Sequence, residues 1–276
     1  MKIKSIFKDG QAVWHLLMLV LVLISVCPIL FAVTGSVKTL EDLYNGGFFP
    51  KEIIFDNFKR IAAAVPIVRI TLNTFIIAVC VTAFKVVTST LAAYSFVYFD
   101  FKGKQIIYFI LISTIFIPFT VTMIPNYLTI SKLGLVDKIW GVMLPQLADA
   151  SGIFLIRQAM RAVPKPLTEI AHLDGISELR ILKDIIIPVT RPAIISTGII
   201  FFINSWNEYV WPTLILRSNE NFTLSLAMQV FTDSEGGVEY TMTMAMAVIT
   251  MILPIALYLI FQRYIMSTFA SSGIKG

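Results

Sequence analysis

The chain has 276 residues, of which 57% are hydrophobic and only 14% are charged, and its mean hydropathy is +0.82. This balance excludes an ordinary soluble domain and is typical of an integral membrane protein. The formal net charge of +5 is modest. Membrane topology accounts for it, so it gives no reason to expect nucleic-acid binding.

Six long apolar stretches predict membrane-spanning helices. A span needs about 20 mostly apolar residues, and unpaired backbone groups are too costly in lipid for open structures to cross. The predicted spans are residues 13–33, 70–97, 105–125, 139–160, 192–214 and 242–265. The first is about twice as long as the core of a signal peptide, so we expect it to be retained. The predicted fold class is all-α, with one transmembrane domain over residues 1–276.

The distribution of Lys and Arg predicts the orientation. These residues are denser in the connecting segments on the side of the N-terminus, which carries Lys2, Lys4 and Lys8. Because positive residues accumulate on the inner side, we expect a multi-pass protein of the cell membrane with both termini in the cytoplasm. The first outer segment, Thr34 to Pro66, is long enough to contact an external partner. Its FDNFKRI sequence predicts a short helix.

The third inner segment, residues 161–191, is charged yet carries aliphatic residues at helical spacing. Pro166 suits the first turn of a helix, because its missing amide is harmless there. This helix is expected to end at about Leu173. Gly175 allows the left-handed backbone that commonly follows a helix.

A second short helix is predicted after the glycine turn. Ser177 can cap it, and it should run towards Ile186. Pro188 and Pro192 are expected to stop it before the fifth span. The two helices would form a compact apolar projection, since exposed aliphatic groups usually mark a surface that another protein covers. The alternative is an ordinary inner loop whose aliphatic side chains fold back on the helical bundle, and the spacing alone does not separate the two.

The sequence EIAHLDGISELRILKDIIIP in this segment resembles the EAA loop of ATP-binding-cassette (ABC) importer permeases. The positions that match the pattern are Glu169, Ala171, Asp174, Gly175, Ile185 and Pro188. Ile170 and Ile176 replace residues that are commonly Ala in that family. The resemblance implies the type I ABC importer permease fold and a loop that seats in a cleft of a cytoplasmic ATPase. The residues implied in this coupling are Glu169, Ala171, Leu173, Asp174, Gly175 and Ile176.

A second resemblance covers NSWNEYVWP at residues 204–212 and the closing SSGIKG. Both are similar to segments of carbohydrate importer permeases, particularly the second, six-span permease of maltose-type sugar uptake systems. The resemblance implies a homologous second permease in a heterodimer, two ATPase subunits that bind ATP and Mg, and an extracellular solute-binding protein. No cofactor is expected on this chain itself.

Polar residues within the predicted fifth span are candidates for a substrate path, because ionisable groups at membrane depth usually face an interior or a water-filled cavity. Amides and carboxylates hydrogen-bond hydroxyl groups, and aromatic rings stack on sugars. The candidates are Asn204, Trp206, Asn207, Glu208 and Tyr209. The alternative is that Glu208 and Asn207 only hold a bend in the helix.

Lys85 lies near the middle of the second span. It could bind an anionic substrate. Alternatively, it pairs with a carboxylate or carbonyl of a neighbouring helix, or extends its ammonium group towards the membrane surface.

Several functions are disfavoured by missing motifs. No G-x-x-x-x-G-K-[ST] loop is present, so the chain is not expected to hydrolyse ATP, and no metalloprotease or serine-hydrolase motif occurs. The main expectation is a permease subunit that imports a sugar or oligosaccharide. One alternative is an importer of a sugar phosphate or glycerol phosphate. An alternative of another class is a self-sufficient carrier or channel, which would need paired ion-coupling carboxylates, whereas only Glu208 is evident.

Overall fold

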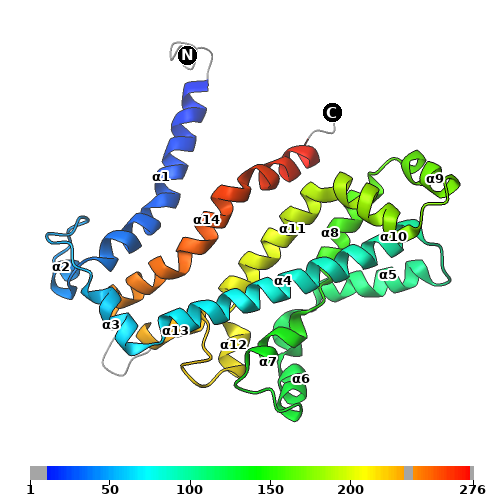
Figure 1. The fold of residues 1–276 in the computed structure, drawn as a ribbon. Helices are drawn as coiled ribbons and strands as arrows, with labels where there is room; N and C mark the ends of the chain where they lie inside the picture. Colours follow the sequence, from blue (N-terminus) through cyan, green and yellow to red (C-terminus); the bar gives the residue numbers. More distant parts are fainter. Residues whose placement is uncertain (1–10, 233–238, 274–276) are drawn as a thin grey trace. The chain divides into compact units, whose positions relative to one another are not determined.

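The computed structural model describes residues 11–232 and 239–273, and every regular element in these residues is helical. Lys2, Lys4, Lys8 and the last three residues of SSGIKG lie outside the described residues. The elements are α1 (Gln11–Ser36), α2 (Leu40–Tyr44), α3 (Asp56–Ala64), α4 (Ile67–Tyr98), α5 (Lys104–Ser113), η2 (Thr114–Phe116), α6 (Phe119–Lys132), α7 (Ile139–Met143), η3 (Leu144–Gln146), α8 (Ala150–Arg161), α9 (Lys165–Leu173), α10 (Glu178–Ile181), the π-helix η4 (Leu182–Ile186), α11 (Ile187–Asn207), α12 (Val210–Ile215), α13 (Leu224–Thr232) and α14 (Tyr240–Gly273), as Figure 1 shows.

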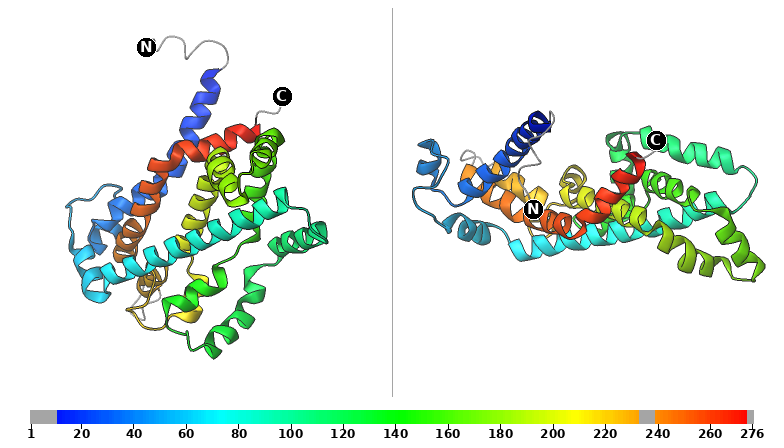
Figure 2. Two further views of the ribbon diagram at one scale, coloured as in Figure 1. Left: turned by 45° about the vertical axis from the view of Figure 1, so that its right-hand side comes forward. Right: turned by 90° about the horizontal axis from the view of Figure 1, so that it is seen from above.

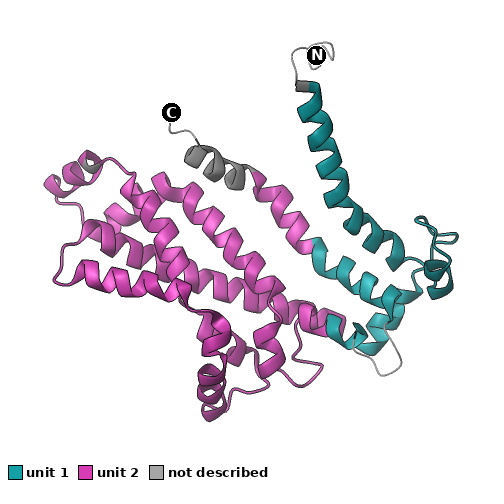
Figure 3. Cartoon of the chain, turned by 180° about the vertical axis from the view of Figure 1, so that it is seen from behind, with its two compact units in different colours: residues 1–65, 228–252 teal, residues 66–227, 253–276 magenta. Residues whose placement is uncertain are grey.

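The chain divides into two compact units, residues 1–65 with 228–252 and residues 66–227 with 253–276 (Figure 3). The first unit contains the outer segment between α1 and α4. The predicted short helix at FDNFKRI is confirmed as α3. Its Asn57 side chain donates to the carbonyl oxygens of Ser36 and Lys38 at 2.9 and 2.8 Å, and Arg60 pairs with Glu239 at 2.9 Å. These bonds give the segment a defined backbone path.

The second unit is built around α4, α8 and α11, which pack against one another (Figure 2). Gly152 of α8 is needed for this close approach. A Cβ atom at this position would lie 2.4 Å from Cζ of Phe201 on α11 and 2.6 Å from Oγ of Ser89 on α4. The helices meet here with no room for a methyl group.

We therefore expect Gly152→Ala to lower the stability of the protein by about 1–3 kcal/mol, the usual cost of overpacking a tight core. Thermal unfolding of the purified protein in detergent would measure this. Gly198→Ala is the matched control, because its added Cβ would have its nearest neighbour, Cγ2 of Val86, at 3.4 Å. Equal melting temperatures for the two variants would contradict the packing argument.

Four helices in the described residues are long and apolar enough to cross a membrane, and the number rises to six if each of two bent helix pairs is one span. The predicted spans at 13–33, 70–97 and 242–265 correspond to single helices. The stretch at 105–125 is instead broken, because residues 104–116 and 119–132 are bent by 99° about Pro118. The stretch at 139–160 is bent by 46° between α7–η3 and α8. Six spans and inward termini remain predictions.

The boundaries of the fifth predicted span were wrong at both ends. The helical segment begins at Glu178 and continues to Asn207, so Pro188 and Pro192 do not stop it. The π-helical turn η4 precedes Pro188, and a proline is tolerated where neighbouring turns adjust to its ring and missing amide. At the other end the helix stops at Glu208, and α12 starts after Tyr209.

Candidate functional site

The predicted turn of the inner segment is present. Helix α9 starts at Lys165, with Pro166 in its first turn, and ends at Leu173. Gly175 has φ +70°, and its amide donates to the carbonyl of His172 at 3.0 Å while the amide of Ile176 donates to the carbonyl of Ala171 at 3.0 Å. These two bonds form a Schellman motif, which satisfies the final carbonyls of a helix and needs a left-handed residue.

The turn fixes how α9 packs against the rest of the second unit. Ala171 is 4% exposed and belongs to a core cluster with residues of α4, α8, α10 and η4, and Ile176 packs against the same cluster. Ala171 was expected on the coupling surface, but its side chain faces the chain's own core. Tyr94 of α4 donates to the Glu178 carboxylate at 2.6 Å, which ties the start of α10 to α4. Ser177 is the N-cap residue of α10, although its side chain makes no capping hydrogen bond.

The outer face of the same segment is apolar and uncovered. Leu173 is 87% exposed and Leu179 is 75% exposed, and Ile170 is more than half exposed. Glu169 and Asp174 are also exposed. A rigid turn therefore presents aliphatic side chains with two carboxylates beside them, which is the composition of a protein docking surface.

Lys85 has a partner that sequence reasoning missed. Its ammonium group lies 3.0 Å from Oδ2 of Asp149 and 5.1 Å from the centroid of the Phe201 ring. Oδ1 of Asp149 accepts from the Ser151 and Gly152 amides at 2.9 and 3.4 Å and from the Ser151 hydroxyl, so Asp149 also caps α8. The pairing that was the alternative for Lys85 is the arrangement found. An acidic residue within an apolar stretch, two positions before Ser-Gly, was the signal for this cap.

The Lys85–Asp149 pair lines a cavity of about 260 Å³. The residues around it are Lys85, Phe119, Pro145, Gln146, Ala148, Asp149, Asn204, Ser205 and Glu208. The structure thus brings together three of the predicted path residues. They are Lys85 from α4, Asn204 from α11 and Glu208 from the bend that follows α11. The expectation that Glu208 has no acidic counterpart is wrong, because Asp149 lines the same cavity.

Glu208 has two roles in this geometry. Its Oε1 accepts from the backbone amides of Val210 and Trp211 at 2.9 and 3.2 Å, so it holds the break between α11 and α12. It also borders the cavity with Asn204. Asn207 is exposed at the end of α11 and does not line this cavity.

The two aromatic candidates lie elsewhere. Trp206 is 1% exposed and stacks on Phe202 with ring centroids 5.7 Å apart. Tyr209 is 47% exposed and does not line the cavity. Trp206 is buried against Phe202, and Tyr209 lies beyond the end of α11, so neither lines this cavity as a stacking surface for a ligand.

A structured loop outside the spanning segments was also missed. Asp137, with φ 59°, accepts from the amides of Arg217 and Ser218 at 2.9 and 3.0 Å and from the Ser218 hydroxyl at 3.0 Å. Burial raises the pKa of its carboxyl group, but these hydrogen bonds outweigh it and lower the pKa from 3.8 to about 2. The carboxylate fixes the loop that follows α12.

Residues 85–269 match the family model described as binding-protein-dependent transport system inner membrane component. The arabinooligosaccharides transport system permease protein AraQ of Halalkalibacterium halodurans is 29% identical, with 92% of each chain covered. The lactose transport system permease protein LacG of Rhizobium radiobacter is 32% identical over 74% of this chain and 75% of its own. The sn-glycerol-3-phosphate transport system permease protein UgpE of Rhizobium meliloti is 26% identical over 92% and 94%.

The fold also occurs in a solved structure. A crystal structure of a bacterial ABC transporter involved in the import of the acidic polysaccharide alginate aligns with a TM-score of 0.82 and 24% identity, covering 96% of this chain and 99% of that chain. This likeness establishes the type I permease fold for the described helices. The family match spans more than half of the chain and includes both the inner segment and the cavity. The chain therefore belongs to the binding-protein-dependent transport system inner membrane components, the permease subunits of ABC importers.

Proposed function

We propose that this chain moves a sugar or oligosaccharide into the cytoplasm, and that a separate ATPase, which binds residues 161–191, drives this transport. The observation that carries the proposal is the Schellman turn at Gly175, which anchors α9 on the core through Ala171 and leaves Leu173 and Leu179 outside. A short rigid element transmits displacement, whereas a flexible loop would absorb it. Glu169 and Asp174 would add polar contacts to the ATPase.

The proposed assembly contains a homologous second permease, two ATPase subunits and an extracellular binding protein, with ATP and Mg held by the ATPases alone. A related structure supports the last partner, since it is described as a bacterial alginate ABC transporter in complex with an alginate pentasaccharide-bound periplasmic protein. The proposed topology has six spans, if both bent pairs cross, and both termini in the cytoplasm.

The cavity favours an uncharged sugar over a sugar phosphate. The cation proposed for an anionic substrate, Lys85, is neutralised by Asp149, and Glu208 adds a second carboxylate. An anion entering here would meet more negative than positive charge, while hydroxyl groups could bond Asn204 and Gln146. The relatives named for arabinooligosaccharides and lactose agree with this preference, and the relative named for sn-glycerol-3-phosphate represents the competing candidate.

Reconstituted transport tests the proposal. The chain would be assembled in proteoliposomes with the partner permease, ATPase and binding protein of its own importer, and uptake of lactose, arabinotriose and sn-glycerol 3-phosphate would be followed. Uptake of a neutral sugar that needs both ATP and the binding protein is the expected result. Sugar uptake by this chain alone without ATP would refute it in favour of a self-sufficient carrier. Selective uptake of glycerol phosphate would refute the substrate class only.

A further inference from the structure

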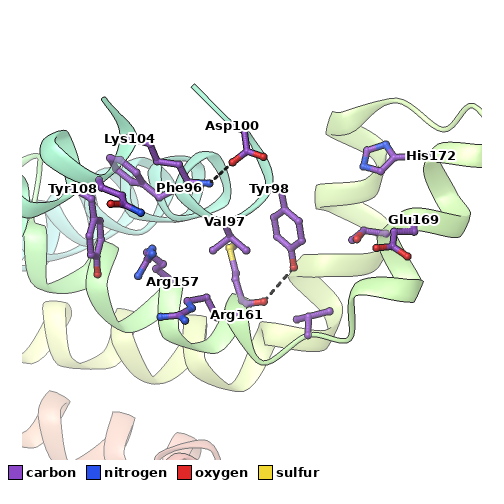
Figure 4. A pocket seen from close by; sticks show the side chains of 14 residues that line it. Phe96, Val97, Tyr98, Asp100, Lys104, Tyr108, Arg157, Arg161, Glu169 and His172 are labelled. Carbon is purple, nitrogen blue, oxygen red and sulfur yellow. Dashed lines mark hydrogen bonds and ion pairs between the residues drawn. The ribbon is translucent and has the colours of Figure 1, made fainter. Parts of the chain in front are cut away.

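A larger cavity, of about 820 Å³, lies apart from the proposed path (Figure 4). It forms where α4 ends and α5 begins, and the last turns of α8 and one face of α9 complete its wall. A candidate membrane span ends at Tyr98, and the bent helix pair proposed as the next span begins at Lys104. In the proposed six-span topology, the cavity therefore lies at about the depth of the lipid headgroups.

Two guanidinium groups from α8, one helical turn apart, lie in this cavity. The guanidinium carbon of Arg157 is 4.0 Å from the centroid of the Tyr108 ring, so the stack holds the side chain in place (Figure 4). Its Nε atom is buried and has no hydrogen-bond partner. Among the described residues, no carboxylate lies within ion-pair distance of Arg157 or Arg161.

The other charges of the cavity do not satisfy this pair. Lys104 bonds Asp100 at 3.2 Å and the Phe99 carbonyl at 2.7 Å, so that acid is already engaged. Glu169 lies on the α9 wall, across the cavity from Arg157 (Figure 4). The lining is therefore positive on the α8 side.

We propose that this cavity binds the phosphate of an anionic membrane lipid through Arg157 and Arg161. Paired guanidinium groups recognise phosphate oxygens by bidentate hydrogen bonds. Basic cavities between spanning helices at the inner membrane surface are suited to acidic headgroups, and the apolar side chains of Phe96, Val97 and Val163 can cover the glycerol and upper acyl carbons. Because Glu169 and His172 of α9 line the same cavity, a bound lipid would contact the base of the docking segment. The inference rests on the membrane location and does not depend on the transported substrate.

Lipid binding to the assembled importer tests this. Native mass spectrometry of the complex, delipidated in detergent and titrated with phosphatidylglycerol or phosphatidylcholine, would count retained lipids. We expect selective retention of phosphatidylglycerol, weakened about tenfold or more in Arg157→Gln/Arg161→Gln because the charge-assisted hydrogen bonds from both guanidinium groups to the phosphate are lost. Arg161→Gln alone, at an exposed position, keeps the test valid if the double variant fails to fold, and it should weaken binding severalfold.

Arg180→Gln/Arg191→Gln is the matched control, since both side chains are exposed and lie outside the cavity. It should retain the lipid like the unmodified chain. Equal binding of the two phospholipids, or equal loss in the control, would overturn the proposal. Displacement of the lipid by millimolar inorganic phosphate would overturn the lipid assignment and indicate a site for a free anion.

Discussion

Replacing Gly175 with valine is expected to reduce ATP-driven sugar uptake by about tenfold or more. Gly175 holds φ +70°, and a left-handed backbone costs an L-residue roughly 1–2 kcal/mol, more for a β-branched side chain. The space around the added Cβ is open, with no atom within 4 Å, so the penalty is one of backbone conformation alone. Relief of this strain would break the bonds to His172 and Ala171 and release α9 from its fixed orientation.

Two measurements would separate loss of coupling from loss of folding. ATPase co-purification and sugar-stimulated ATP hydrolysis should fall with uptake, while the membrane content of the permease stays near its normal level. Gly175→Asn should retain most activity, because Asn tolerates the left-handed region. Gly134→Val imposes similar strain at φ +66° in a loop outside the docking segment, and it should leave coupling intact. If Gly175→Val leaves both ATPase association and uptake unchanged, the coupling model is wrong.

Breaking the Lys85–Asp149 pair is expected to destabilise the protein by on the order of 2–3 kcal/mol. The value lies below that for fully buried pairs, because both side chains border a cavity. Lys85→Met leaves the Asp149 carboxylate without its cation. Asp149→Asn leaves the ammonium group unpaired but preserves the cap of α8, since Asn caps helices as well as Asp does.

The double variant decides the role of the pair. If the two charges serve chiefly each other, Lys85→Met/Asp149→Asn should recover most of the stability lost by the single variants, giving a clear coupling energy in thermal unfolding measurements. It should also recover uptake of a neutral sugar. Additive losses would show that the contact contributes little. Recovered stability with abolished uptake would place Lys85, Asp149 or both in substrate binding.

Local sequence patterns predicted the long helices, one turn and the family resemblance. The length of each apolar stretch determines whether a helix can cross lipid, so the approximate positions of the long helices were evident from hydropathy alone. The Schellman turn depends on one residue type at one position, and Gly175 together with Pro166 specified it. The family resemblance of the inner segment and of residues 204–212 is likewise a matter of short motifs.

Contacts between distant segments required the tertiary structure. Lys85 and Asp149 are 64 residues apart, and no local pattern links them. Whether Trp206 faces a cavity or the core depends on how α11 packs, and the structure buries it against Phe202. Proline gave no reliable boundary, because the chain bends by 99° about Pro118 but continues as a helix through Pro188. The sequence by itself determined roughly where the long apolar helices lie and where one turn must form, because those depend on neighbouring residues. The tertiary structure alone decided which polar groups meet, because desolvated charges need partners that packing brings from elsewhere in the chain.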